Sequence, residues 1–268
     1  MHIKPKKSLG QNFLVDKNIL KKIVSCPEFS GRDIVLEIGS GRGGLTLELA
    51  PYVKKVYALE IDQRLYPELE KNLAGLNNCL VVKGDILKFN ISQFLDLNEV
   101  EQKVKVIGNI PYYISSPIIE HLINHRRHIK EAYLTVQKEF ARRVIASPGS
   151  KDYSSFSCFV QYYAKVKILF DIKSSCFRPA PNVDSSFLSL KLRERPEIEI
   201  KDEDVFFGMI RTAFNQRRKT LRNTLSGFLT KLEMENVLAE LGIGINARAE
   251  ELSLSQFAQL YKNIQKKS

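Results

Sequence analysis

Long hydrophobic runs are missing from this chain of 268 residues. No apolar stretch approaches the roughly 18 residues that a membrane-spanning helix needs, so the sequence predicts no transmembrane segment. The start of the chain, residues 1–7, is basic but is not followed by the apolar region of a signal peptide, and the first motif begins too early to leave room for a mitochondrial leader. We therefore expect a soluble, cytoplasmic protein.

Cysteine and histidine are scarce, and neither is arranged for metal binding. The four cysteines are widely separated, form no Cys-x-x-Cys pair and have no histidine at ligand spacing: Cys26, Cys79, Cys158 and Cys176. His121 and His125 are four residues apart on an expected helix, but no third ligand and no His-Glu-x-x-His pattern accompanies them. The sequence thus predicts reduced thiols, surface histidines and no metal site.

Acidic residues are in the minority. Lys and Arg number 41 against 30 Asp and Glu, which gives a formal net charge of +11 and a sequence pI of about 9.4. This excess favours a polyanionic partner, either nucleic acid or an anionic membrane surface. Because the chain offers a membrane no long apolar run, we expect nucleic acid and no membrane partner.

Short apolar runs rich in β-branched residues alternate with helix-like stretches in the first half of the chain. The runs are residues 34–38, 56–59, 80–83, 104–108 and 132–136, and helices are expected at residues 64–73 and 116–128. Such alternation predicts βαβ units on a parallel sheet. Two further strand-like runs, residues 165–172 and 185–192, are separated by a loop-like stretch and should pair as an antiparallel hairpin at the end of the sheet.

The hydrophobic pattern changes after residue 194. Apolar residues then recur at helical spacing with no further strand signal. We therefore expect two domains, an α/β domain at residues 1–194 and a small helical domain at residues 195–268.

A glycine-rich turn, residues 37–44, follows the first predicted strand and precedes a helical stretch. Its glycines let the backbone turn sharply and approach a ligand closely at a helix N-terminus. Gly39, Gly41 and Gly44 also satisfy the dinucleotide spacing G-x-G-x-x-G, and Glu60 ends the second strand, where a ribose-binding acid would lie. These residues predict a cofactor with a nucleoside part, and a nicotinamide dinucleotide stays open at this step.

Asp85 follows the third strand and adds a second acid at the same edge of the sheet, although an aspartate here also serves simply as a turn cap. Together, Gly39, Glu60 and Asp85 look like the glycine loop, ribose acid and adenine-contacting acid of class I S-adenosylmethionine methyltransferases. Ile61 and Ile86, next to the two acids, are counted with them as cofactor-binding residues. The predicted fold is accordingly α/β, a class I, Rossmann-like methyltransferase sheet with a small C-terminal helical domain.

The tetrapeptide after the fourth strand, Asn109-Ile110-Pro111-Tyr112, carries the most specific chemistry. It resembles the (Asp/Asn/Ser)-Pro-Pro-(Tyr/Phe) loop of amino-methyltransferases, with Ile110 in place of the first proline. An adenine N6 amine is a poor nucleophile because its lone pair is delocalised into the ring. The Asn109 side-chain oxygen and the Ile110 carbonyl are placed to accept its two hydrogens and aim the amine at the methyl group, so Asn109 also borders the cofactor. Pro111 would stiffen the turn and Tyr112 would stack on the base. The alternative is a simple Asn-x-Pro turn that ends the strand, with Tyr112 packed nearby and no catalytic role.

Six stretches in chain order resemble motifs of one family, the KsgA/RsmA ribosomal RNA adenine dimethyltransferases of the bacterial small subunit. They are residues 7–14, 109–115, 137–139, 177–185, 214–223 and 248–253. The resemblance implies that Gln11, Asn12 and Leu14 help enclose the methyl donor and that Phe177 closes the other face of the target base. It spans nearly the whole chain.

The resemblance also implies the reaction. The expected activity is S-adenosylmethionine-dependent dimethylation of the N6 amines of two adjacent adenosines near the 3′ end of 16S ribosomal RNA, during small-subunit assembly, by a monomer. Ile110 and Tyr113 stand where Leu and Asn are frequent in the family, and Asn182 stands where lysine is usual. The first two changes keep a backbone acceptor, and the third removes one charge that would touch RNA.

The C-terminal domain is expected to bind RNA. If residues 206–225 are largely helical, Arg211, Arg218 and Arg222 lie along one face, with Arg217 and Lys219 beside it. Such a stripe suits phosphates, although most charge runs are solvated faces.

Three other hypotheses remain at this stage. One is a 23S ribosomal RNA adenine methyltransferase of the macrolide-resistance type, against which residues 214–223 count. Another is a non-enzymatic RNA-binding assembly factor, and the third is a nicotinamide oxidoreductase. Methylation of each ribosomal RNA and the choice between the two cofactors would separate them.

Overall fold

The computed structural model describes residues 3–267 of the chain. These residues form two compact units. The sheet unit holds the residues up to Ala141 together with Ala164–Glu194, and the helical unit holds Arg142–Tyr163 and the residues from Arg195 onward.

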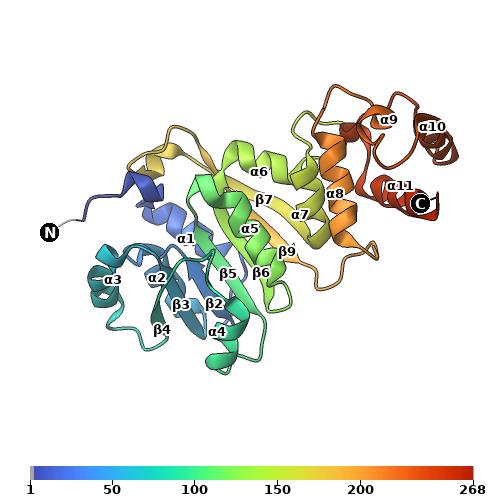
Figure 1. The fold of residues 1–268 in the computed structure, drawn as a ribbon. Helices are drawn as coiled ribbons and strands as arrows, with labels where there is room; N and C mark the ends of the chain where they lie inside the picture. Colours follow the sequence, from blue (N-terminus) through green and yellow to red (C-terminus); the bar gives the residue numbers. More distant parts are fainter. Residues whose placement is uncertain (1–2, 268) are drawn as a thin grey trace. The chain divides into compact units, whose positions relative to one another are not determined.

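The sheet unit is built on seven strands in the order β4-β3-β2-β5-β6-β9-β7 (Figure 1). Their bounds are β2 (Ile34–Ile38), β3 (Lys55–Glu60), β4 (Cys79–Lys83), β5 (Val104–Asn109), β6 (Ile129–Gln137), β7 (Ala164–Ile172) and β9 (Ser185–Leu192). The strands from β4 to β6 are parallel to their neighbours, and β9 runs antiparallel between β6 and β7. The predicted α/β class, the parallel strands and the terminal antiparallel pair are confirmed.

Burial explains why these segments are strands. β2 and most of β3 and β5 are covered on both faces, which is why their residues are mostly apolar and do not alternate. Glu37 in β2 and Lys105 in β5 are buried exceptions. β7, at the edge of the sheet, alternates covered and exposed positions and places Lys165 and Lys167 on the exposed ones. Charged side chains on an edge strand discourage pairing with another chain.

Helices and short turns connect the strands. The helices of the sheet unit are α1 (Lys17–Ser25), α2 (Gly44–Leu49), α3 (Tyr66–Leu73), α4 (Ile91–Leu97) and α5 (Ser115–Asn124). Ahead of them, the 3-10 turn η1 (Lys7–Leu9) and the two-residue strand β1 (Phe13–Leu14) cross the carboxyl ends of the strands, and β1 pairs antiparallel with β8 (Phe177–Arg178). We call residues 3–12 the N-terminal strap.

The helical unit consists of two parts of the chain. Its elements include α7 (Ser155–Tyr163), α8 (Glu203–Phe214), α9 (Leu221–Thr224), α10 (Lys231–Glu240), η6 (Ala249–Glu251) and α11 (Leu254–Lys267), while α6 (Lys138–Ile145) spans the division between units. One division between the two units falls at Glu194 and another at Ala141, so residues 142–163, which were expected in the first domain, lie in the helical unit. They belong to the helical unit because α7 packs on α8, with Phe159 and Phe207 ring centroids 5.3 Å apart and the Tyr163 hydroxyl donating to Glu203 at 2.5 Å.

The expected helix at residues 206–225 is interrupted. α8 ends at Phe214, a turn occupies residues 215–220, and α9 begins after an extended Thr220. The Leu221 backbone N–H donates to the Ala247 carbonyl at 2.9 Å, so a contact from a distant segment fixes the new start. Among the described residues, no helix is long and apolar enough to cross a membrane.

Candidate active site

A pocket opens at the carboxyl ends of the parallel strands. Its walls come from the N-terminal strap, the glycine loop, the ends of β3 and β4, and the loop after β5: residues 9–13, 38, 39, 41, 59–61, 84–86, 109–114 and 118. Nearly all of the cofactor and catalytic residues predicted from sequence are brought together here, and Leu14 and Phe177 are the exceptions.

The glycine loop has the backbone geometry that its residues predict. Gly39 has φ +73° and Gly41 has φ +58°, in the left-handed region that favours glycine. A Cβ on Gly41 would lie 3.0 Å from the Phe13 ring, so a larger residue would displace Phe13 of β1. The Gly41 N–H donates to the Glu60 carboxylate at 2.7 Å, which ties the loop to the end of β3.

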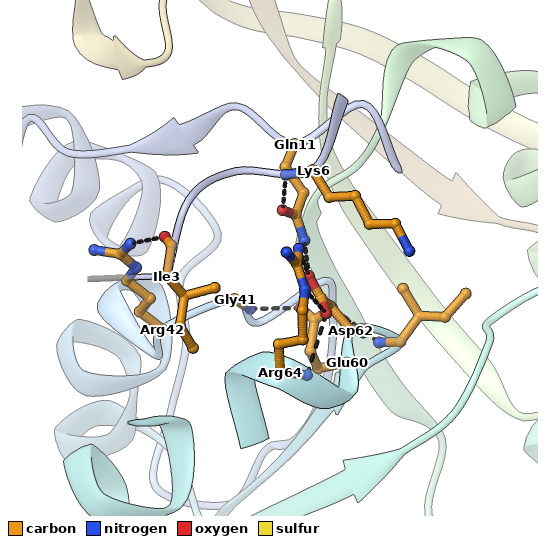
Figure 2. A network of polar contacts seen from close by, with 9 residues as sticks. Ile3, Lys6, Gln11, Gly41, Arg42, Glu60, Asp62 and Arg64 are labelled. Atoms are coloured by element: carbon orange, nitrogen blue, oxygen red, sulfur yellow. Dashed lines mark hydrogen bonds and ion pairs between the residues drawn. The ribbon is translucent and has the colours of Figure 1, made fainter. Parts of the chain in front are cut away.

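Glu60 lines the pocket and belongs to a network of polar contacts (Figure 2). Its carboxylate is buried and accepts backbone hydrogen bonds from Gly41, from Ile61 at 2.9 Å and from Asp62 at 2.8 Å. Burial raises the pKa of Glu60 above its ordinary value, although these three backbone donors oppose the shift. Such a fixed carboxylate is suited to accept hydrogen bonds from the hydroxyl groups of a ribose.

An apolar surface and a second acid flank Glu60. Ile61 is 45% exposed and lines the pocket, which provides an open apolar side chain for the face of a planar ring. Asp85 accepts a hydrogen bond from the Leu87 N–H at 3.0 Å and also lines the pocket, so both interpretations of this residue hold, as a turn cap and as a pocket acid. Ile86 is buried and also lines the pocket.

Asp62 was not predicted from sequence. Its carboxylate is only 4% exposed, receives a hydrogen bond from the Gln11 side chain at 2.9 Å and forms an ion pair with Arg64 at 2.6 Å. The Arg64 guanidinium lowers the pKa of Asp62 to about 2, so this acid is charged at any physiological pH. The available signal was an acid two residues after Glu60 and two before an arginine.

Asn109 ends β5 beside the glycine loop. The preceding residue must be small, because a Cβ on Gly108 would lie 2.6 Å from the Ile38 carbonyl oxygen of the paired strand. The Asn109 side-chain nitrogen donates to the Asn12 carbonyl at 2.7 Å. This bond uses the donor end of the amide, so the oxygen end is the one presented as an acceptor.

Tyr112 is held by its hydroxyl. The Tyr112 hydroxyl and the Ser185 hydroxyl lie 2.5 Å apart, and Ser185 is fully buried at the start of β9. Burial raises the pKa of Tyr112 above its ordinary value, so the hydroxyl stays protonated in the working range. Pro111, with φ −61° and ψ 132°, leads into the short turn η4 (Tyr112–Ile114).

A second pocket adjoins the first. It shares Phe13, Gly39 and Asn109 with the cofactor pocket and is further lined by Leu14 and Arg178, among others. Leu14 therefore lies on this neighbouring side, and Asn109 stands where the two pockets meet.

Phe177 is not placed as the sequence prediction requires. Its side chain is fully buried and packs in the core of the sheet unit with Leu20, Ile23 and Phe187. It lines neither pocket. The physical reason is that β8 pairs with β1 and turns this ring inward, so it offers no face to a base in this arrangement.

The predicted stripe of arginines along one helix face does not form. Arg217 forms an ion pair with Glu250 at 3.2 Å and donates to the Lys151 carbonyl at 2.7 Å. Arg222 pairs with Glu235 at 2.7 Å. Arg211, Arg218 and Lys219 are exposed. Because α8 ends before residue 215, these five residues do not share one helix face.

The histidine pair has structural partners. His121 Nε2 lies 2.9 Å from the Phe89 carbonyl, and His125 Nδ1 lies 3.0 Å from the His121 carbonyl. Among the described residues, no group of three or more acids, histidines or cysteines is arranged to hold a metal ion.

The parallel sheet, the glycine loop, the ribose acid and the amide-bearing loop after β5 define a class I, Rossmann-like methyltransferase.

Comparisons with known proteins narrow this class. The family model for ribosomal RNA adenine dimethylase matches residues 2–266. The ribosomal RNA small subunit methyltransferase A of Bacillus cytotoxicus is 43% identical over 261 residues, which are 95% of this chain and 89% of that protein. The chain belongs to the ribosomal RNA adenine dimethylase family and is therefore an S-adenosylmethionine-dependent enzyme.

Solved structures agree with this assignment. The dimethyladenosine transferase from Plasmodium falciparum is 32% identical with a TM-score of 0.80, and the match covers 95% of this chain and 98% of that one. The 23S rRNA methyltransferase ErmE is 26% identical with a TM-score of 0.74, and the match covers 95% and 100% of the two chains. The hypothesis of a nicotinamide oxidoreductase is therefore wrong, because the chain belongs to a methyltransferase family.

Proposed function

We propose that the protein transfers methyl groups from S-adenosylmethionine to the N6 amines of two adjacent adenosines near the 3′ end of 16S ribosomal RNA, during small-subunit assembly. One observation carries the mechanism. The Asn109 amide lies where the two pockets meet, and its donor end is engaged by the Asn12 carbonyl. Its acceptor end is thereby directed to the reacting amine.

The residues of the first pocket fit the cofactor. When bound, S-adenosylmethionine supplies an electrophilic methyl group on a sulfonium centre. Glu60 would accept hydrogen bonds from the ribose, Asp85 would accept one from the adenine amine, and the exposed Ile61 would cover the ring. The fit rests on the buried, backbone-bound carboxylate of Glu60 and on the glycine loop, which leaves room for close approach.

The chain's own residues perform the positioning. The Asn109 oxygen and the Ile110 carbonyl accept the two N6 hydrogens, which pulls the amine out of conjugation and returns its lone pair to nitrogen. With S-adenosylmethionine held by Glu60, Asp85 and Ile61, this lone pair would take the methyl group, and the sulfur would keep the electrons of the C–S bond. The cationic amine that results loses its proton to water, so no general base is required.

Tyr112 holds the base on the acceptor side. Its ring is oriented by the Ser185 hydrogen bond and would stack on the target adenine. The second pocket, which contains Leu14 and Arg178, is where we place the approach of the nucleotide. Phe177 has no part in this proposal because it is buried.

The helical unit is proposed to bind RNA phosphates through its exposed cations, Arg211, Arg218 and Lys219. Arg217 and Arg222 are assigned instead to holding the turn at residues 215–220 and α9, since both are paired with glutamates. A monomer working in the cytoplasm completes the proposal.

The small subunit is favoured as the substrate over the large one. The relative named for the small subunit is 43% identical, whereas the 23S rRNA methyltransferase ErmE is 26% identical. The decisive experiment is transfer of labelled methyl groups to purified small and large subunits from a strain that lacks the gene, followed by mass spectrometry of both RNAs. We expect dimethyladenosine in 16S RNA, and product in 23S RNA alone would contradict the proposal.

A role in small-subunit assembly that is separate from the methyl transfer is the second candidate. In the same strain, the Asn109→Ala variant separates the two. If the variant restores normal small-subunit assembly without methylating the RNA, then assembly depends on binding of the protein and not on methyl transfer. Methyl transfer by the parent would still establish the enzymatic activity.

A further inference from the structure

The N-terminal strap is attached at both of its ends (Figure 2). At its start, the Arg42 guanidinium donates to the Ile3 carbonyl at 2.7 Å. At its far end, the Gln11 side chain donates to Asp62 at 2.9 Å, and the Asn12 carbonyl accepts from Asn109 at 2.7 Å. The last two attachments come from consecutive residues, so the position of Gln11 determines where the Asn12 carbonyl lies.

Asp62 is oriented before it meets the strap. Arg64 donates to one carboxylate oxygen from Nε at 2.9 Å and to the other from its terminal nitrogen at 2.6 Å. The Arg64 backbone N–H adds a bond at 3.2 Å. A two-point arginine–carboxylate pair fixes the carboxylate plane, so Asp62 presents a fixed charged acceptor to Gln11.

Gln11 joins three segments through one amide. Its oxygen accepts from the Lys6 N–H at 2.7 Å, within the strap, while its nitrogen reaches the loop after β3. That loop begins with Glu60, whose carboxylate binds the glycine loop. The Asp62 side chain does not line the cofactor pocket, and Gln11 is its contact with the strap. The Asp62 backbone N–H also donates to Glu60, a bond that an alanine at this position keeps.

We infer that Asp62 is a positioning residue of the methyl transfer: through Gln11 it fixes the strap, and the Asn12 carbonyl then holds the Asn109 amide with its oxygen toward the acceptor. This inference rests on the proposed function, because it takes Asn109 as the residue that binds the reacting amine. Closure of the strap over the cofactor and alignment of the acceptor are then one event.

Cofactor affinity tests the first half of the inference without any methyl transfer. S-adenosylmethionine binding is measured by calorimetry for Asp62→Ala, Gln11→Ala and the double variant. A buried hydrogen bond to a charged group predicts about a tenfold loss in each single variant. Because Gln11→Ala already removes the bond that Asp62→Ala removes, the double variant should match Gln11→Ala, and a further tenfold, additive loss would overturn the inference.

The rate at saturating cofactor tests the second half. Single-turnover transfer by Asp62→Ala should be slowed about tenfold even when the cofactor site is full, because the Asn109 amide is no longer held. In an Asn109→Ala background, Asp62→Ala should cause no further slowing. A parental rate for Asp62→Ala at saturation would overturn the inference. Glu70→Ala is the matched control, since it removes a nearby acid that pairs with Lys83 and should keep parental values.

Protease access gives an independent readout. Trypsin cleavage after Lys6, followed by intact mass, should be faster in Asp62→Ala than in the parent with cofactor bound. Equal cleavage rates would overturn the inference. If Asp62→Ala does not fold, Gln11→Ala carries the same tests, because it leaves the Asp62–Arg64 pair intact. Parental transfer by Asn109→Ala would instead overturn the proposed mechanism and would leave the measured coupling in cofactor affinity unaffected.

Discussion

The side-chain amide of Asn109 has a nitrogen end and an oxygen end, and the two differ in what they do. The nitrogen end is bound to the Asn12 carbonyl. The oxygen end is proposed to act on the substrate amine. Substitutions that treat the two ends separately therefore test the mechanism at the scale of one residue.

Asn109→Ala removes both ends and should reduce single-turnover methyl transfer by about a hundredfold or more, by analogy with the loss of an oxyanion-hole donor. Binding of cofactor and RNA should change little, since the interaction is made mainly in the transition state. Asn109→Asp keeps an acceptor but places a carboxylate against the Asn12 carbonyl, so we expect an intermediate rate and weaker cofactor binding. Near-parental transfer by Asn109→Ala would contradict the mechanism.

Tyr112 separates stacking from anchoring. Tyr112→Ala should slow transfer and weaken RNA engagement, because base stacking on an aromatic ring is worth roughly 1 to 3 kcal/mol. Tyr112→Phe keeps the ring but frees it from Ser185, so its effect should be mild and equal to that of Ser185→Ala. The measurements are transfer rate and RNA affinity. A Tyr112→Phe variant as impaired as Tyr112→Ala would show that the hydroxyl, and not the ring face, carries the role.

Motifs predicted Glu60, Asp85 and Asn109 because each follows a strand in a recognisable local pattern. Asp62 and Ser185 were not assigned roles because their partners are Gln11 and Tyr112, which are 51 and 73 residues away. No local pattern records such a pairing. For Phe177, the motif indicated the residue type, but strand pairing decides which way its ring points.

At the scale of elements, β5 and β2 approach each other closely where Gly108 pairs with Ile38. Gly108→Ala would place a Cβ 2.6 Å from a backbone oxygen, where no flexible side chain can yield. We expect a loss of about 1 to 3 kcal/mol in the free energy of unfolding, with slower transfer because Asn109 is displaced. Denaturant unfolding checks this. Gly75→Ala is the control, because nothing lies within 4 Å of its added Cβ, and equal losses in both variants would contradict the argument.

β2 also contains an ionisable group with no exposure to water. Burial raises the pKa of Glu37 to about 7 from 4.5, against hydrogen bonds from Thr46 and Ser40 that lower it. Between pH 4.5 and about 7, Glu37 holds a proton in the folded protein and has lost it in the unfolded chain. This residue therefore makes the free energy of unfolding fall as pH rises through that range.

Glu37→Gln should remove that pH dependence while keeping an oxygen for the Thr46 hydroxyl. We expect the variant to gain stability relative to the parent as pH rises from 4.5 to 7, by up to about 3 kcal/mol above pH 7. Unfolding by denaturant at several pH values measures it. Parallel curves for the two proteins would show that Glu37 is ionised in the folded state throughout.

The strands were predictable because a parallel strand covered on both faces is mostly apolar along its length, with Glu37 in β2 and Lys105 in β5 as exceptions. The interruption of the expected helix at residues 206–225 was not predictable, because Leu221 and Leu225 resume the helical spacing after the polar residues 215–220. The interruption depends on the hydrogen bond from Leu221 to Ala247, a tertiary contact that helical periodicity does not report.

At the scale of the whole molecule, the net charge of +11 predicts binding that weakens with salt. Neutralising Arg211, Arg218 and Lys219 together should flatten the salt dependence of RNA affinity by close to one unit of log-log slope per lost phosphate contact, with cofactor affinity unchanged. Affinity measured across a salt series tests this. An unchanged slope would place the RNA surface elsewhere.

Neutralising Arg217 and Arg222 is the control for that experiment. Because each is paired with a glutamate within the helical unit, their neutralisation should lower thermal stability more than it flattens the salt slope. The charge total could be counted from the sequence, but which cations are committed to internal pairs depends on folding. Composition therefore predicted the kind of partner and not the residues that meet it.

The pairing of β1 with β8 joins Phe13–Leu14 to Phe177–Arg178 and closes the strap region with residues from far along the chain. During translation from the N-terminus, the chain must be synthesised to Arg178 and beyond before this pair can form. The glycine loop, Glu60 and Asn109 will already have left the ribosome, yet the segment after the strap will still lack its partner strand. Nascent chains stalled before residue 177 should therefore release S-adenosylmethionine faster than chains stalled after β9. A newly made enzyme thus acquires its closed cofactor site only after Arg178 has been synthesised, which delays methylation competence until the sheet is nearly whole.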